Sequence, residues 1–342
     1  MKIPYLKYYF TKSILLLFVL LLNASVSSGQ QVETISINMD KLEKKPLLLS
    51  EITGNITSIT LDSLISGNLV DIFLTSKYLF VTTMSSVYQF KPSGKFVSKF
   101  NCGGSISHST CDTTKQEIYV LMKNKIKSFD FSGKLKKEYS IKHDGINCFF
   151  HGGKLWIQSA NVSFKTPAVD YKLSYLNLQT GVETFLPLNI QKKIEKDEEA
   201  ITIYPATFFI DNQTNNNLIC SFSIDNTLYR IQGQNVKPVI RWTHPVVSKY
   251  KSTRKYIFKD YLFVHFSAQG DPLLYVQNMK TQKQYLTEFL RDDIFGSGNI
   301  HIGSFNQGGC FYFIRKENEL KGKYSNNSRS ENRNVIIIAD LK

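Results

Sequence analysis

The sequence lacks the motifs that mark the best-known catalytic and metal sites. It has no Cys-x-x-Cys pair, and no cysteine and histidine stand at a spacing suited to zinc. It also lacks the Gly-x-Ser-x-Gly motif of a serine nucleophile and the His-Glu-x-x-His motif of metalloproteases. No standard hydrolase chemistry is therefore indicated, and we expect a protein that binds a ligand more than one that catalyses a reaction.

The chain also lacks an apolar run long enough to span a bilayer. The run at residues 14–22 has nine apolar residues, whereas a membrane helix needs roughly 20. Three lysines precede this run, and the small residues Ser27 and Gly29 follow it. This order predicts a secretory signal peptide over residues 1–29, cleaved before Gln30. Because no cysteine lies near the cleavage site, we do not expect a lipoprotein. We expect the mature chain to have no transmembrane segment and to be located in the periplasm or outside the cell.

The formal net charge of +14 does not point to nucleic acid. The lysines are dispersed among predicted strands and turns, and no recognition helix accompanies them. An exported protein also seldom meets nucleic acid. A basic, solvated surface suits acidic glycans or lipopolysaccharide instead.

The five cysteines leave two alternatives open. An odd number cannot all pair within one chain, although an export compartment permits disulfides. Cys102 and Cys111 are close enough in sequence to bridge across a turn. Cys148, Cys220 and Cys310 lie in apolar runs and are interpreted as small buried hydrophobic residues. One disulfide, between Cys102 and Cys111, or none is expected.

One short apolar strand recurs six times along the chain. Each copy holds β-branched or aromatic residues after a polar turn, as is typical of all-β proteins. Four of the five steps between copies lie near the ~40–50 residues of a four-stranded blade. The pattern predicts a six-bladed β-propeller over residues 56–342. The copies are Tyr78–Val81, Ile118–Val120, Leu155–Ile157, Leu218–Cys220, Leu262–Val264 and Phe311–Phe313.

A predicted hairpin follows each of the first five copies. Four of these hairpins have a glycine at the turn, namely Gly94, Gly133, Gly181 and Gly233. We expect each of these glycines to supply the positive φ that a tight reversal requires.

The two ends of the propeller region are predicted to share its last blade. Residues 56–61 form a strand without a blade of its own, and residues 334–338 form a third strand without a partner. Pairing them closes the ring and removes exposed strand edges. Residues 30–55 are left as an N-terminal extension. The one long step between copies contains the Lys- and Glu-rich residues 189–200, which we expect to form a small helical insertion.

Three short motifs resemble those of exported six-bladed β-propeller proteins from Bacteroides and related Bacteroidetes. They are Phe129–Lys134, with the pattern Phe-Asp-x-x-Gly-Lys, then Asp225–Ile231, and the apolar strand Ile336–Lys342. The sequence departs from that family at Asn101–Ser105, where a Gly-Pro-Gly-Glu-like loop is common. The family has no general assigned chemistry, so the resemblance implies a fold and an exported location, and no reaction.

Ligands of propellers usually bind at a mouth of the central channel, where loops enter the innermost strands. Polar residues near these entries are the candidate ligand-binding residues. Histidine suits such a role because it titrates near neutral pH and binds metals, although a lone histidine at a strand end is usually only hydrogen-bonded. The candidates are Asn68, Asp71, His108, His143, Asp144, Tyr204, Tyr256, Asn299 and His301.

The function expected from these observations is that of an exported envelope binding protein. Its ligand is a glycan, a peptide or an envelope protein, bound at the channel mouth by a monomer. The 18 Tyr and 24 Phe are enough to fill the cores between blades and leave rings on loops for sugars or peptides. No cofactor is expected, apart from calcium in the alternative of a calcium-dependent propeller hydrolase or lyase, which would use Asp71, Asp144, Asn68 and Asn299. A purely structural envelope protein is a third alternative.

Overall fold

Nearly all of the regular structure is β-strand, as the β-branched and aromatic runs predict. The computed structural model describes residues 32–163, 168–193, 206–211, 217–222, 224–243, 250–268, 271–296, 298–300, 310–320 and 333–342. Within these ranges, helix is limited to α2 (Leu49–Ile52) and the 3-10 turns η1 (Met39–Lys41) and η2 (Glu317–Glu319). None of the described helices is long and apolar enough to cross a membrane.

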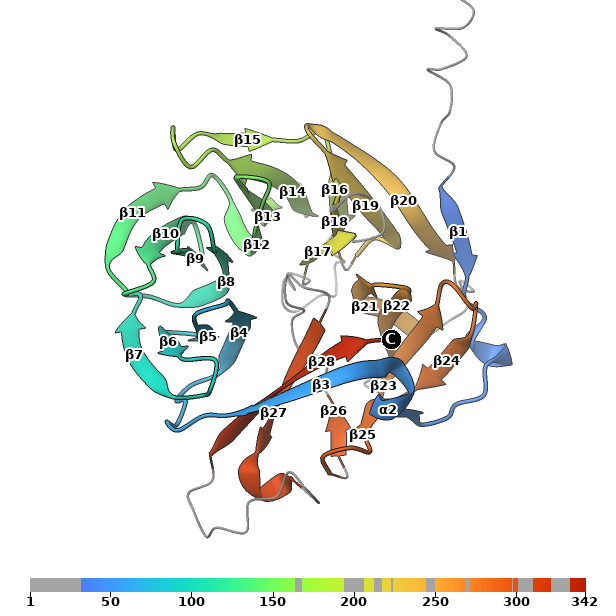
Figure 1. Ribbon diagram of the computed structural model, residues 1–342. Helices are drawn as coiled ribbons and strands as arrows, with labels where there is room; N and C mark the ends of the chain where they lie inside the picture. The colour runs from blue at the N-terminus through green and yellow to red at the C-terminus, as the bar shows by residue number, and fades with distance from the viewer. Residues whose placement is uncertain are drawn as a thin grey trace, which may run out of the picture.

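The strands of the described residues form seven sheets around a common centre, and the protein is a β-propeller (Figure 1). Blade 1 comprises β4 (Leu69–Leu74), β5 (Leu79–Thr83), β6 (Ser86–Phe90) and β7 (Phe96–Asn101). Blade 2 comprises β8 (Ile106–Asp112), β9 (Glu117–Met122), β10 (Lys125–Asp130) and β11 (Leu135–Ser140). Blade 3 comprises β12 (Asp144–His151), β13 (Lys154–Ser163), β14 (Ala168–Leu176), β15 (Glu183–Phe185) and β16 (Ile190–Lys193).

Three of the remaining four blades, blades 4, 6 and 7, include a strand from the N-terminal part of the chain. Blade 4 comprises β17 (Ala206–Asp211), β18 (Asn217–Phe222), β19 (Thr227–Gln232), β20 (Asn235–Thr243) and β1 (Glu33–Ser36). Blade 5 comprises β21 (Tyr250–Phe258), β22 (Tyr261–Ala268), β23 (Asp271–Asn278) and β24 (Gln284–Thr287). Blade 6 comprises β2 (Leu47–Leu48), β25 (Leu290–Asp292) and β26 (Gly298–Ile300). Blade 7 comprises β27 (Cys310–Lys316), β28 (Asn334–Leu341) and β3 (Thr53–Thr60).

The prediction of six blades was wrong, because the described residues form seven. The blade that the repeat pattern missed is blade 6, which lies between the copies of the repeat at Leu262 and Phe311. Its strands β25 and β26 have three residues each, and its third strand, β2, comes from the predicted N-terminal extension. Strands this short contain too few apolar residues to give a recognisable repeat.

The predicted closure of the ring is confirmed. Strand β28 pairs antiparallel with β27 on one side and with β3 on the other. The pairing sets Ile336 opposite Ile59 and Ile338 opposite Thr57. Residues far apart in the sequence thus complete one sheet and close the ring.

The helix predicted near residues 189–200 is wrong for its first part. Residues Ile190–Lys193 form strand β16, which pairs with β14. The side chain of Ile190 is buried in the core. The side-chain amide of Gln191 donates a hydrogen bond to Asp170 Oδ1 at 2.8 Å. Pairing with the long strand β14 therefore overrides the helical preference of the lysines. Residues 194–200 lie outside the described residues.

Residues 33–52 of the N-terminal extension add structure to the propeller. Strand β1 pairs in parallel with β20, and β2 pairs in parallel with β25. Apolar side chains of the segment are buried, including Ile37, Leu47 and Leu49, each fully inaccessible to solvent. This segment contributes to the hydrophobic cores of blades 4 to 7.

Candidate functional site

The first strands of neighbouring blades contact one another and form the inner wall of the ring. This wall brings together two of the predicted site residues, Asp71 on β4 and His108 on β8. His108 Nε2 lies 3.3 Å from Asp71 Oδ1. The carboxylate is buried, and it accepts hydrogen bonds from the Ser109 amide at 2.6 Å and the Ser109 hydroxyl at 3.1 Å.

This cluster does not have the geometry of a catalytic triad. In a triad, the imidazole lies between the carboxylate and the nucleophilic hydroxyl. Here the hydroxyl of Ser109 lies within hydrogen-bonding distance of Asp71 and of Thr82 Oγ1, at 2.9 Å. The Asp71 carboxylate therefore contacts both His108 and Ser109. These contacts link β4 to β8 across the boundary between blades 1 and 2.

The neighbouring predicted residues His143 and Asp144 have separate surroundings. The His143 ring lies 5.4 Å from the ring of Phe185 in an edge-to-face arrangement, and burial lowers its pKa. Asp144 Oδ2 lies 3.6 Å from Lys123 Nζ, in an exposed position. Among the described residues, no group of three or more His, Cys, Asp or Glu side chains has a geometry that would hold a metal ion.

The other predicted residues lie apart from the Asp71 cluster. Asn68 is exposed, with its amide nitrogen 3.7 Å from the Met84 sulfur. Tyr256 is buried in the core, and its ring stands edge-to-face with His265. Tyr204 and His301 lie outside the described residues.

Cys102 and Cys111 are buried in one hydrophobic cluster. Cys102 is a free thiol, so no disulfide joins the two in the structure. Burial raises the pKa of Cys102 to about 11 and that of Cys111 to about 12. Both residues stay protonated at neutral pH, which makes them poor nucleophiles.

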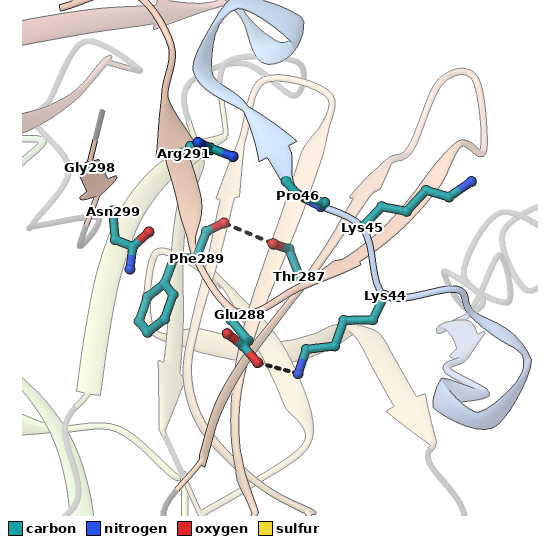
Figure 2. A pocket seen from close by; sticks show the side chains of 9 residues that line it. All are labelled: Lys44, Lys45, Pro46, Thr287, Glu288, Phe289, Arg291, Gly298 and Asn299. Carbon is teal, nitrogen blue, oxygen red and sulfur yellow. Dashed lines mark hydrogen bonds and ion pairs between the residues drawn. The ribbon is translucent and has the colours of Figure 1, made fainter. Parts of the chain in front are cut away.

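The last predicted residue, Asn299, lines a pocket with a volume of about 530 Å³ (Figure 2). This volume falls in the range of small-molecule sites. The pocket lies where the N-terminal segment crosses blade 6, next to the end of blade 5. Its lining residues are Lys44, Lys45, Pro46, Thr287, Glu288, Phe289, Arg291, Gly298 and Asn299.

Strand pairing sets two polar residues that line this pocket opposite each other. Arg291 on β25 is the direct partner of Asn299 on the antiparallel strand β26. Because partners in an antiparallel pair lie on the same face, their side chains project together. Both residues are exposed, whereas their strand neighbours Leu290 and Ile300 are buried.

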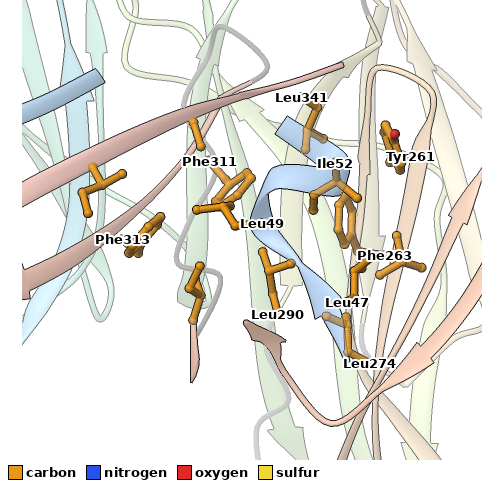
Figure 3. Close-up of a cluster of buried hydrophobic side chains, with 14 of the residues drawn as sticks. Leu47, Leu49, Ile52, Tyr261, Phe263, Leu274, Leu290, Phe311, Phe313 and Leu341 are labelled. Carbon is orange, nitrogen blue, oxygen red and sulfur yellow. The ribbon is translucent and has the colours of Figure 1, made fainter. Parts of the chain in front are cut away.

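The buried face of blade 6 fixes the orientation of this pair. Leu290 lies beside Leu47 and Leu49 of the N-terminal segment in the core (Figure 3). Since a one-residue slip of β25 would expose Leu290 and bury Arg291, the hydrophobic core holds the register. Asp292, on the buried face, is fully engaged by Arg315 and by the backbone amides of residues 294 and 295.

Among the residues that the structure describes, the charges around the pocket leave one cation without a partner. Lys44 forms an ion pair with Glu288, and Lys45 pairs with Glu43 at 2.7 Å. The neighbouring carboxylate of Asp293 accepts hydrogen bonds from Ser50. The Arg291 side chain has no ion pair or hydrogen bond with any residue that the structure describes. Its guanidinium therefore presents a fork of donors to the pocket.

Sequence reasoning found Asn299 and missed Arg291. The sequence Leu290-Arg291-Asp292 shows no alternation of apolar and polar residues, and only the structure reveals that Arg291 is exposed between two buried residues. The pairing of β25 with Leu47–Leu48 could not be deduced from spacing. Asn299 lines this pocket, and its placement at the channel mouth stays a prediction.

No known protein family and no curated protein matches the sequence. Solved structures match the fold. A protein of Bacteroides fragilis described as exported gives a TM-score of 0.63 at 13% identity, covering 91% of this chain and 100% of that chain. A member of the DUF4221 family from Bacteroides vulgatus gives a TM-score of 0.47 at 11% identity, over 85% of this chain and 97% of that one. A Bacteroides thetaiotaomicron protein of unknown function gives a TM-score of 0.47 at 8% identity, covering 88% of this chain and 76% of that chain. The chain thus shares its fold with the B. fragilis protein described as exported.

Proposed function

We propose that this protein is an exported binding protein that recognises an anionic group in the pocket of Arg291 and Asn299. The observation that carries the proposal is the guanidinium of Arg291, which pairs with none of the described residues, in a pocket whose other cations are neutralised. A guanidinium binds carboxylate or sulfate groups through two parallel hydrogen bonds. The Asn299 amide, on the next strand, can donate a further hydrogen bond to the same ligand or accept one from a hydroxyl.

An acidic glycan is the ligand class that best fits this pocket. Its uronate or sulfate group would contact Arg291, and its hydroxyls would contact Asn299 and the Thr287–Glu288 edge. The ring of Phe289 lines the same pocket and offers an apolar surface for a sugar (Figure 2). The basic balance of the chain would also attract a polyanion.

The test is a calorimetric titration of the purified full chain with trigalacturonate, and with its methyl ester as a neutral control ligand. A charge-assisted hydrogen bond contributes about 1.5–3 kcal/mol, so Arg291→Gln should weaken binding of the acid roughly 10- to 100-fold. Lys136→Gln, which removes an exposed lysine on blade 2, is the matched control and should change the affinity little.

The titration also separates a specific site from general attraction by a basic surface. If Arg291→Gln and Lys136→Gln weaken binding equally, the guanidinium is not the anchor and the proposal fails. Equal affinity for the acid and its ester would refute it as well. Addition of EDTA during the titration would reveal a calcium contribution, which the alternative of a calcium-dependent hydrolase requires.

A further inference from the structure

A second pocket, of about 600 Å³, lies between the outer parts of blades 1 and 2. It is formed by strands β6 and β7 of blade 1 and by the turns that follow β8 and β10 of blade 2. None of its residues belongs to the pocket of Arg291. The lining residues are Tyr78, Gln89, Val97, Ser98, Thr114, Lys115, Gln116, Asp130, Phe131 and Ser132.

Rigid aromatic side chains form one wall of this second pocket. The ring of Tyr78 stands edge-to-face with Phe131 at a centroid distance of 6.1 Å, and Phe131 packs on Phe80 at 4.8 Å. Phe131 and Phe80 are buried, whereas Tyr78 is partly exposed. The Tyr78 ring is therefore held in place by the core beneath it, and little conformational freedom would be lost when a ligand packs on it.

Gln89 supplies a buried polar group on the same side of the pocket. The residue is 3% exposed, and its Oε1 accepts a hydrogen bond from the Ser98 hydroxyl at 2.7 Å. Its amide nitrogen has no hydrogen-bond partner among the residues that the structure describes. This donor can therefore bond an acceptor of a ligand that enters the pocket.

The opposite rim adds the side-chain amide of Gln116 and a hydrogen-bonding turn. Gln116 has a positive φ of 55°, and its carbonyl accepts a hydrogen bond from the Phe131 amide at 3.0 Å. This places its exposed side chain at the rim. Asp130 Oδ1 accepts hydrogen bonds from the Ser132 and Lys134 amides and from the Ser132 hydroxyl, and this hydroxyl contact is the largest cause of its lowered pKa.

The pocket is electrically balanced, since Asp130 and Lys115 are its one acidic and one basic residue. A charged ligand would gain little net attraction there. A neutral ligand with several hydroxyls and an apolar face would match the alternating donors, acceptors and aromatic ring.

We propose that the pocket between blades 1 and 2 binds a neutral sugar unit, packed on Tyr78 and hydrogen-bonded by Gln89 and Gln116. This site is independent of the proposed anion site at Arg291. The two sites give the protein separate specificities for a neutral and an acidic sugar.

The experiment is a binding screen of the full chain on an array of neutral oligosaccharides, with calorimetry on each hit. Neutral binding should fall at least fivefold in Tyr78→Leu, which removes the ring, and in Gln116→Gly, which removes the amide and tolerates the positive φ. Gln282→Gly is the matched control, because Gln282 is exposed and has a φ of 60° in blade 5. It should bind as the unchanged protein does.

The outcomes separate the two proposals. Neutral sugar binding that Tyr78→Leu and Gln116→Gly reduce, and that Arg291→Gln leaves unchanged, supports the second site. No neutral oligosaccharide bound, or neutral binding unaffected by Tyr78→Leu, overturns it. Circular dichroism and melting of each variant check that the fold is kept. Titration of the Tyr78→Leu variant with trigalacturonate shows whether the anion site still binds its ligand when the neutral-sugar site has been removed.

Discussion

Replacement of Gly94 by alanine should destabilise the protein far more than the same change at another turn glycine. Gly94 lies in the β6–β7 turn at a φ of +87°, where its turn packs on the end of β3. A Cβ at this position would meet the Thr60 carbonyl oxygen at 1.9 Å and its carbon at 2.9 Å. Both atoms belong to the backbone, so no side-chain rotation can relieve the clash.

The size of the effect follows from two contributions. An alanine at positive φ costs roughly 1–2 kcal/mol in any turn. Relief of the clash requires the turn to move away from β3, which strains or breaks the Asp62 N–H to Gly94 O hydrogen bond of 3.1 Å. Such overpacking typically costs about 1–3 kcal/mol. We expect Gly94→Ala to lower the free energy of unfolding by about 2–5 kcal/mol.

Gly233→Ala is the control, because Gly233 also has a positive φ, of +64°, in the β19–β20 turn. Nothing lies within 4 Å of a Cβ there, so only the conformational cost remains. Urea unfolding monitored by the fluorescence of the two tryptophans measures both variants, after reversibility has been checked. Losses that agree within about 0.5 kcal/mol would refute the packing argument.

Two further predictions concern buried titratable groups. Lys255 is fully buried, with Nζ donating to the carbonyls of Phe222 and Asp225, and burial lowers its pKa to about 7. Because the unfolded chain keeps this proton up to the ordinary pKa of 10.5, the folded state should gain stability as the pH rises from about 7 to 10.5. The melting temperature of Lys255→Met should rise less over this window; identical pH profiles would contradict the argument. Cys102 and Cys111 should resist Ellman's reagent at pH 8 until the protein is denatured, because their thiols are buried and protonated. Rapid labelling of the native protein, or an intact mass lower by the two hydrogens of a disulfide, would contradict the reduced state.

The sequence predicts those parts of the fold that depend on local pattern. Glycines at four hairpin turns have the expected positive φ, for example +87° at Gly133 and +74° at Gly181. The pairing of β28 with β3 also follows from the sequence, since each strand lacked a local partner. Both inferences rest on strands long enough to show their period.

Blade 6 and its pocket could not be predicted in the same way. Leu47 and Leu48 pair with β25 across a large sequence separation, and a two-residue strand carries no periodic signal. Arg291 stands between buried residues only because this pairing exists. Likewise, Asp71 and His108 were recognised separately as polar residues, but their 3.3 Å contact depends on the packing of blade 1 against blade 2.

The pairing of β28 with β3 also has a consequence for synthesis. A chain made from its N-terminus presents β3 long before β28, and closing so large a loop is entropically slow. During that interval β3 has an unpaired edge, which is the kind of surface that promotes aggregation. The strand reads Thr-Gly-Asn-Ile-Thr-Ser-Ile-Thr, and most of its residues are polar. The polar composition of β3 therefore limits aggregation of the incomplete propeller, because its unpaired edge offers few apolar side chains to other chains.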